Sequence, residues 1–326
     1  MSGATSTPAT GTGSLRYDPE FLRTISAIPG GQSPQPIPKD VFDLRATTDF
    51  ILSVGGASAQ VPKDIAETTL HFTAKDGTTL PLYRFTPPNA TRGPAILFVH
   101  GGGMVAGNVK LFRPTILNYC AAAAVTVYAV GYRLAPEHPF PTPAEDVYSS
   151  LEWLHAHAAE EGIDKTRIGI CGASAGGGLA AGAALMARDR GLSPALARLL
   201  LVYPMLDDRT TVGKNDALTP FLTWTARHNE LGWEAYLKDV KGEVSPYAAP
   251  ARAKDLSGLP RTYIDVGGLD LFRDEDVDFA ARLAKAGVDV ELHLYPGLPH
   301  GWEFVASHIP VSQRADQNRM AAWSDF

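Results

Sequence analysis

One serine of the sequence stands in a setting that would make it a nucleophile. Ser174 lies in Gly172-Ala173-Ser174-Ala175-Gly176, directly after the strand-like run RIGIC and directly before an alanine-rich helical segment. Glycines two positions to either side permit a sharp strand-to-helix turn that leaves the hydroxyl exposed at a helix N-terminus. A Walker-type phosphate loop needs a lysine beside the serine, and this segment has none. The pattern predicts nucleophilic serine chemistry; the alternative is a glycine-rich helix start that serves only packing.

A serine nucleophile needs a base, and the base needs an acid that orients it. Asp270 follows the strand-like run TYIDVGG, and His300 follows VELHLYPG, so both lie just past a strand, as Ser174 does. Loops after parallel strands meet at one edge of a sheet, so these three side chains can converge. Asp265 and His293 lie inside their strands, which favours Asp270 as the acid and His300 as the base. A loop or helix-capping role is the alternative for Asp270.

Three consecutive glycines, Gly101 to Gly103, follow the apolar run PAILFV and His100. A carbonyl attacked by Ser174 becomes an anion that needs donors about 2.7 to 3.1 Å away. Residues without side chains let backbone N–H groups approach that closely. A dinucleotide-binding turn would show G-x-G-x-x-G opening a helix and an acidic residue further on, which HGGGMVAGNVK does not. We therefore predict that the glycine loop binds an oxyanion.

A parallel sheet is needed to bring the candidate serine, histidine, aspartate and glycine loop together, and the sequence contains the strand and helix patterns of such a sheet. We expect residues 1–14 to be a disordered tail. In residues 15–62 we expect short N-terminal helices, which are joined by a proline-rich link and pack as part of a cap. From residue 63 on, the sequence alternates strand and helix patterns, interrupted at about 206–253 by an aromatic helical insertion that could form the rest of the cap. The predicted strands are 67–73, 79–86, 95–99, 125–130, 167–171, 199–203, 262–266 and 290–295, and the predicted helices include 142–160, 175–190 and 274–286. We expect an α/β fold with an eight-stranded, mainly parallel sheet flanked by helices.

Composition narrows the class of protein. The chain has 326 residues, 45% of them hydrophobic, and a formal net charge of −6, which argues against a nucleic-acid partner or an anionic membrane surface. Cys120 and Cys171 lie in apolar stretches without metal-ligand spacing and predict buried thiols. His155 and His157 are two apart on a predicted helix, so we expect surface residues and no metal pair. The N-terminus resembles no signal peptide and no apolar run could span a bilayer, so we expect a cytoplasmic protein.

Five ordered motifs closely resemble one family. HGGG at 100–103, YRLAPEHPFPTPAEDV at 132–147, GASAGG at 172–177, GGLDLFRDE at 267–275 and PHGWE at 299–303 are similar to those of hormone-sensitive-lipase-like carboxylesterases of the α/β-hydrolase fold, the bacterial family IV type. The resemblance runs from about residue 67 to the C-terminus. It implies that Ser174, Asp270 and His300 form a catalytic triad. It also implies that the backbone N–H groups of Gly102, Gly103 and Ala175 form the oxyanion hole.

The resemblance also implies a substrate class. The protein is expected to cleave short- to medium-chain carboxylic esters through an acyl-enzyme, without a cofactor or a metal. Its partner would be a small-molecule ester, and a homodimer is one expectation because family members are often dimers. Amidase, lactonase or carbamate hydrolase activity is the alternative, and a non-catalytic small-molecule receptor is a further one. Met104, Phe221 and Trp224 are the candidate substrate-binding side chains.

The motifs depart from the family at two positions, and the resemblance also implies four support residues. Ala173 stands where the family usually has Asp or Thr, and Met104 stands where a large aromatic is usual. His100 is implied to shape the glycine loop. A further set is implied to tie the loop near the floor of the site, namely Arg133, Glu137 and Asp146.

Overall fold

The computed structural model describes residues 15–57, 61–90 and 93–326. The predicted tail, residues 1–14, lies outside the described residues. The strands are Ala66–Thr73 (β1), Thr79–Thr86 (β2), Gly93–Val99 (β3), Thr126–Val130 (β4), Ile163–Ala173 (β5), Arg198–Val202 (β6), Arg261–Gly267 (β7) and Val290–Tyr295 (β8). They form one sheet in the order β1-β2-β4-β3-β5-β6-β7-β8. Strand β2 is antiparallel to both β1 and β4, and the other neighbours are parallel, which confirms the predicted sheet.

Alternating side chains of the central strands fill two hydrophobic cores, one on each face of the sheet. In β3, Leu97 and Val99 point into one core, and Ile96 and Phe98 point into the other. Strands β4 and β6 alternate in the same way. A parallel sheet buried on both faces has this pattern because successive side chains project to opposite sides.

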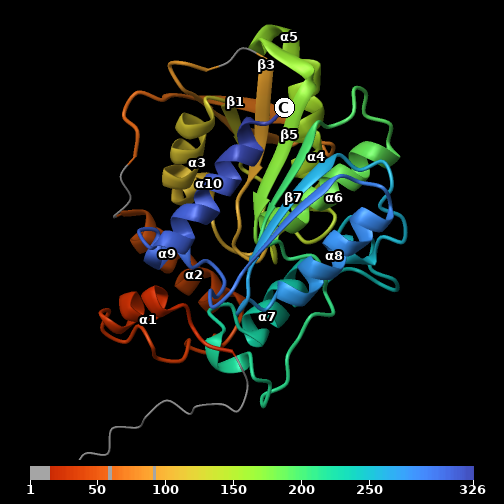
Figure 1. The fold of residues 1–326 in the computed structure, drawn as a ribbon. Coiled ribbons are helices and arrows are strands. Elements are labelled where there is room, and N and C mark those ends of the chain that lie inside the picture. Colours follow the sequence, from red (N-terminus) through yellow and green to blue (C-terminus); the bar gives the residue numbers. More distant parts are fainter. Residues whose placement is uncertain (1–14, 58–60, 91–92) are drawn as a thin grey trace, which may run out of the picture.

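Helices cover both faces of the sheet. They are Pro19–Ser26 (α1), Val41–Ala57 (α2), Val109–Ala123 (α3), Thr142–Ala156 (α4), Ala158–Glu161 (α5), Ala175–Asp189 (α6), Ala226–Tyr236 (α7), Arg273–Lys285 (α8), Glu303–Ala306 (α9) and Pro310–Ser324 (α10). Figure 1 shows α3 and α10 on one side of the sheet and α4, α6 and α8 on the other. The predicted helix 142–160 is divided into α4 and α5 at His157. The sequence prediction named neither α3 nor α10.

The register of the parallel strands brings the candidate site residues to one edge. Val99 of β3 pairs with Gly172 of β5, and Ala173 of β5 pairs with Val202 of β6. Gly267 of β7 pairs with Tyr295 of β8. The segments that leave these strands therefore start at a common level of the sheet.

Helices α1, α2 and α7 lie at that same end of the sheet (Figure 1). The insertion between β6 and β7 also contains two short 3-10 turns, Thr219–Phe221 (η1) and Pro250–Arg252 (η2). Helix α2 packs against α3, α7 and α9, and α1 packs against α9. Two segments far apart in sequence thus meet near the carboxyl ends of the parallel strands.

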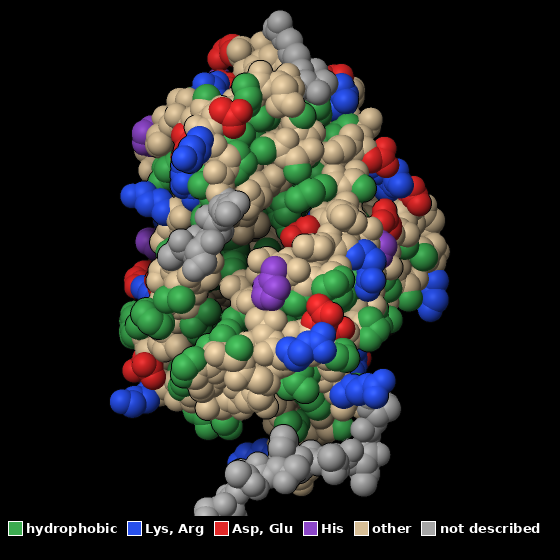
Figure 2. Space-filling view, turned by 60° about the vertical axis from the view of Figure 1, so that its left-hand side comes forward, with side chains coloured by type: hydrophobic (Ala, Val, Ile, Leu, Met, Phe, Trp, Pro, Cys, Tyr) green, Lys and Arg blue, Asp and Glu red, His purple; other side chains and the backbone are tan. Residues whose placement is uncertain are grey.

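The surface carries no broad area of a single charge in the view of Figure 2, where acidic and basic side chains are mixed. Hydrophobic side chains gather in the lower part of that face, the level at which α1, α2 and α9 lie. Helices α2 and α9 carry exposed large hydrophobic residues, namely Phe42, Phe50, Ile51, Val54 and Val305. Within the described residues, no helix combines the length and hydrophobicity that a bilayer crossing requires.

Two predictions about isolated residues have different outcomes. Cys120 and Cys171 are free and buried, as predicted. The surface prediction for His155 is wrong, because this side chain is buried on the inner face of α4. Burial lowers the pKa of His155.

Candidate active site

Ser174 stands at a strained turn between β5 and α6. Its backbone has φ 56° and ψ −123°, which a non-glycine residue adopts only when the surrounding structure enforces it. A Cβ on Gly172 would lie 2.0 Å from the carbonyl oxygen of Gly176. A Cβ on Gly176 would lie 2.1 Å from the carbonyl oxygen of Val99. The two glycines are thus required by close backbone contacts, which explains their spacing around the serine.

The structure brings Ser174, His300 and Asp270 together in a chain of hydrogen bonds. His300 Nε2 lies 3.0 Å from Ser174 Oγ, and His300 Nδ1 lies 2.7 Å from Asp270 Oδ2. Asp270 is fully buried, and its Oδ1 accepts a hydrogen bond from the Phe272 N–H at 2.9 Å. A carboxylate on Nδ1 fixes the tautomer in which Nε2 accepts the serine proton. This arrangement can generate a nucleophilic alkoxide at Ser174.

Aromatic rings hold the imidazole of His300. The Tyr203 and Phe272 rings meet it edge-on, with centroid distances of 4.5 and 5.2 Å. Thr223, in the insertion, donates from its hydroxyl to the His300 carbonyl at 2.6 Å. The His300 side chain is only 12% exposed. The ring therefore has little freedom to leave the line between Ser174 and Asp270.

Tyr203 belongs to a buried polar network that the sequence did not reveal. Its hydroxyl donates to Glu303 Oε1 at 2.6 Å, and Arg319 Nη1 donates to the same oxygen at 3.0 Å. Arg319, 1% exposed, also makes a two-pronged contact with Asp265 at 2.6 and 2.9 Å. Asp265 thus faces α10 and not the triad. Arg319 lies 54 positions from Asp265, and no local pattern marks it.

The glycine loop lies beside the serine. A Cβ on Gly101 would come within 3.2 Å of the Ser174 Cβ. Gly102 and Gly103 have φ values of 123° and 62°, which side chains rarely allow. Among the hydrogen bonds of the described residues, neither the Gly102 nor the Gly103 N–H has a protein acceptor. Ala175 is the first residue of α6, so its N–H has no acceptor within the helix.

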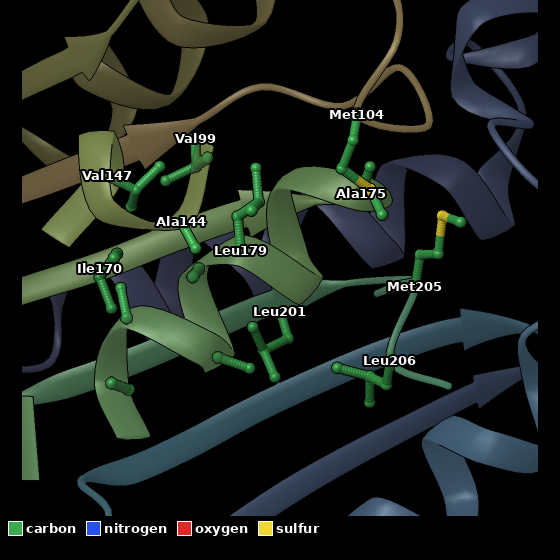
Figure 3. Packing of buried hydrophobic residues seen from close by; sticks show 14 of the residues in the cluster. Val99, Met104, Ala144, Val147, Ile170, Ala175, Leu179, Leu201, Met205 and Leu206 are labelled. Atoms are coloured by element: carbon green, nitrogen blue, oxygen red, sulfur yellow. The ribbon is translucent and has the colours of Figure 1, made fainter. Parts of the chain in front are cut away.

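The structure places the three candidate substrate-binding residues differently. Trp224 approaches Gly103, where an added Cβ would lie 2.7 Å from its ring, and its own ring centroid is 6.4 Å from that of His300. Phe221 is partly exposed and packs edge-on against Tyr17 of the N-terminal segment at 5.0 Å. Met104 is 1% exposed, and its side chain points toward Ala175 within the core (Figure 3).

Two support groups flank the loop. His100 stacks on Tyr132 at 4.2 Å, and the Tyr132 hydroxyl donates to the His100 carbonyl at 2.8 Å. Burial lowers the pKa of His100 to about 4, so the ring is neutral at neutral pH. Arg133 pairs with buried Asp146, with an Nη2 to Oδ1 distance of 2.6 Å. Glu137, the remaining implied support residue, does not join this pair but forms an ion pair with Arg45 of helix α2.

Comparison with known proteins identifies the class of this fold and site. A model of the α/β-hydrolase fold matches residues 96–304. The esterase LipI of Mycobacterium tuberculosis is 36% identical over 73% of this chain and 74% of its own length. The carboxylesterase NlhH of the same species is 35% identical over 76% of this chain and 79% of its own.

Solved structures agree. A bacterial heroin esterase superposes with a TM-score of 0.84 and 38% identity, covering 94% of this chain and 97% of its own. A thermostable esterase from Pseudomonas putida gives a TM-score of 0.85 and 27% identity, covering 96% and 98%. The chain belongs to the α/β-hydrolase fold family, in its hormone-sensitive-lipase-like branch. It is a carboxylic ester hydrolase.

Proposed function

We propose that this esterase acts through a Ser174-His300-Asp270 triad and an acyl-enzyme. The observation that carries the proposal is the unbroken hydrogen-bonded chain from Ser174 Oγ through the imidazole to Asp270. His300 Nε2 takes the serine proton as Oγ attacks the ester carbonyl, and then gives that proton to the departing alcohol. Water, activated by the same nitrogen, releases the acid and restores Ser174. None of these steps requires a cofactor or a metal.

The oxyanion formed in each half-reaction would be bound by backbone N–H groups. Gly102, Gly103 and Ala175 are the proposed donors. Their N–H groups are free of protein acceptors in the loop and at the helix start, which supports this role. Donors fixed in place before the reaction stabilise developing charge without reorganising.

The acyl group would lie beneath the cap, by which we mean α1, α2 and the insertion 206–253. Trp224, in the insertion, packs against Gly103, which supports a wall that limits chain length. Phe221 of the insertion packs edge-on against Tyr17, two residues before α1 begins. We propose short- to medium-chain acyl esters as substrates. Met104, whose buried side chain points toward Ala175, would act on this site by shaping its floor.

A series of p-nitrophenyl esters from acetate to laurate tests the substrate proposal. We expect kcat/KM to be highest for short and medium acyl chains and to fall for laurate. Trp224→Ala should move the optimum to longer chains, whereas Trp153→Ala, in α4, where the ring stacks on His157, should leave it in place. A flat profile, or an unchanged optimum in Trp224→Ala, contradicts the proposed wall. The matching anilides, lactones and carbamates test the alternative bond preferences.

A further inference from the structure

Side chains of helix α2, in the cap, form hydrogen bonds with the loop that carries the proposed oxyanion donors. We call residues 101–107 the oxyanion loop. Arg45 Nε donates to the Val105 carbonyl at 2.5 Å. Asp49 Oδ1 accepts a hydrogen bond from the Gly107 N–H at 2.7 Å. Arg45 and Asp49 are four positions apart on the helix, so both side chains project from one face of α2.

The oxyanion loop needs such contacts because its own conformation is unfavourable. Gly102, Gly103 and Met104 have consecutive positive φ values of 123°, 62° and 60°. The loop's internal hydrogen bonds run from the N–H groups of Val105 and Ala106 to the Gly102 carbonyl, at 3.1 and 2.8 Å. These bonds close one turn but do not fix where that turn lies relative to Ser174.

Arg45 is itself held rigidly. Its guanidinium donates to both carboxylate oxygens of Glu137 at 2.8 and 2.6 Å, and to the Ala135 carbonyl at 2.7 Å. The same Ala135 donates from its N–H to the Met104 carbonyl at 3.0 Å. The hydrogen bond from Arg45 lowers the pKa of Glu137 to about 2, so the pair stays ionised at neutral pH. A bidentate arginine–carboxylate pair also fixes geometry better than a single contact.

Helix α2, which carries Arg45 and Asp49, is itself held in place because it packs against α3, α7 and α9. Helix α7 reaches the oxyanion loop as well, because a Cβ on Gly232 would lie 3.0 Å from the Gly103 carbonyl. The cap therefore contacts the loop at Gly103, Val105 and Gly107. Among the described residues, the N–H groups at positions 102 and 103 have no protein acceptor.

We propose that Arg45 and Asp49 are positioning residues that hold the oxyanion loop in its catalytic conformation, so that the cap serves the transition state as well as the substrate pocket. The proposal rests on the oxyanion role assigned above to Gly102 and Gly103. The interaction with the loop donors is strongest once the carbonyl oxygen is an anion. Loosening the loop should therefore weaken transition-state binding far more than ground-state binding.

The test compares Arg45→Met, Arg45→Lys, Asp49→Ala and Asp49→Asn with wild type on a p-nitrophenyl ester. Arg45→Met and Asp49→Ala should lower kcat by about ten- to a hundred-fold, less than the loss of a whole donor, with KM within about three-fold. Asp49→Asn keeps an acceptor oxygen and should recover most of the rate. Arg45→Lys cannot span both the Val105 carbonyl and Glu137, and should recover only part of it.

A transition-state analogue separates positioning from mere stability. A trifluoromethyl ketone forms a tetrahedral oxyanion adduct with the serine, so its inhibition constant should rise by the same factor as kcat/KM falls. The constant of a matched uncleavable ether, which makes no oxyanion, should not change. Asp43→Asn on the exposed side of α2, and Arg23→Met in the exposed pair of α1, are the controls and should behave as wild type.

Each outcome decides the matter. Full kcat in both Asp49→Ala and Arg45→Met would overturn the proposal. So would a fall in kcat that follows a lowered melting temperature while the ketone binds as tightly as before. Failure of the proposed function looks different, because wild type itself would then neither turn over the ester nor bind the ketone.

Discussion

Asp270→Asn is the substitution whose effect follows most directly from the geometry of the site. Asp270 is fully buried, and each of its oxygens has one task. Oδ1 accepts from the Phe272 N–H at 2.9 Å, and Oδ2 accepts from His300 Nδ1 at 2.7 Å. Asparagine has nearly the same shape but only one acceptor oxygen, so it cannot perform both tasks.

The backbone decides which way the new amide turns. The Phe272 N–H has to face the amide oxygen, which leaves the NH₂ group facing His300. The imidazole must then accept at Nδ1 and carry its proton on Nε2, where it points at Ser174 and cannot act as a base. The same exchange of tautomer in a Ser-His-Asp template lowers kcat about 10⁴-fold, which corresponds to about 5.5 kcal/mol of barrier.

Steady-state hydrolysis of p-nitrophenyl acetate at neutral pH measures this effect. Asp274→Asn is the matched control, because that carboxylate lies four residues further on and is 82% exposed. We expect the control to retain wild-type kcat and Asp270→Asn to lose about four orders of magnitude with its fold intact by circular dichroism. A folded Asp270→Asn enzyme within about ten-fold of wild type would refute the role of Asp270.

Three further substitutions test other parts of the structure. Gly103→Ala places a Cβ 2.7 Å from the Trp224 ring at a residue with φ +62°. We expect kcat to fall about a hundred-fold, while the free energy of unfolding falls by only about 1–2 kcal/mol. A loss of stability in melting curves without a loss of kcat would contradict this prediction. Arg319→Met leaves buried Asp265 unpaired and should lower the free energy of unfolding by about 3–5 kcal/mol in urea titrations, whereas a loss below about 1 kcal/mol would contradict it. Burial raises the pKa of Glu275 to about 8, so the folded state holds this proton more tightly than the unfolded state does, and stability should decline as pH rises from about 5 to about 8. In Glu275→Gln this decline in the free energy of unfolding should be smaller by an amount on the order of a few kcal/mol. If wild type and Glu275→Gln lost the same stability between about pH 5 and about pH 8, the prediction would be wrong.

The sequence predicts those parts of the site that depend on local backbone chemistry. The glycines around Ser174 and in the oxyanion loop are required by close approaches between backbones, and such requirements leave a readable spacing. The positions of Asp270 and His300 after their strands follow from the parallel sheet, which periodicity also predicts. These residues could be named because short motifs mark each of them.

Residues that act from a distance could not be named in this way. Arg319 reaches the site from the last helix, and Arg45 reaches it from the N-terminal helix α2. Their partners are set by how helices pack on the finished sheet, and packing leaves no fixed spacing along the chain. For Met104 the motif was misleading. Its place after the glycines suggested a substrate-binding side chain, but the residue has a positive φ and its side chain points toward Ala175 in the core.

Labelling with a fluorophosphonate tests the central claim most directly. The reagent reacts with a serine only when a base activates it and an oxyanion site receives its phosphoryl oxygen. Intact-mass and peptide mass spectrometry should find one adduct per chain, on Ser174, and none in Ser174→Ala. Adduct formation at another residue, undiminished labelling of Ser174→Ala, or an unlabelled wild type that still hydrolyses esters would contradict the account.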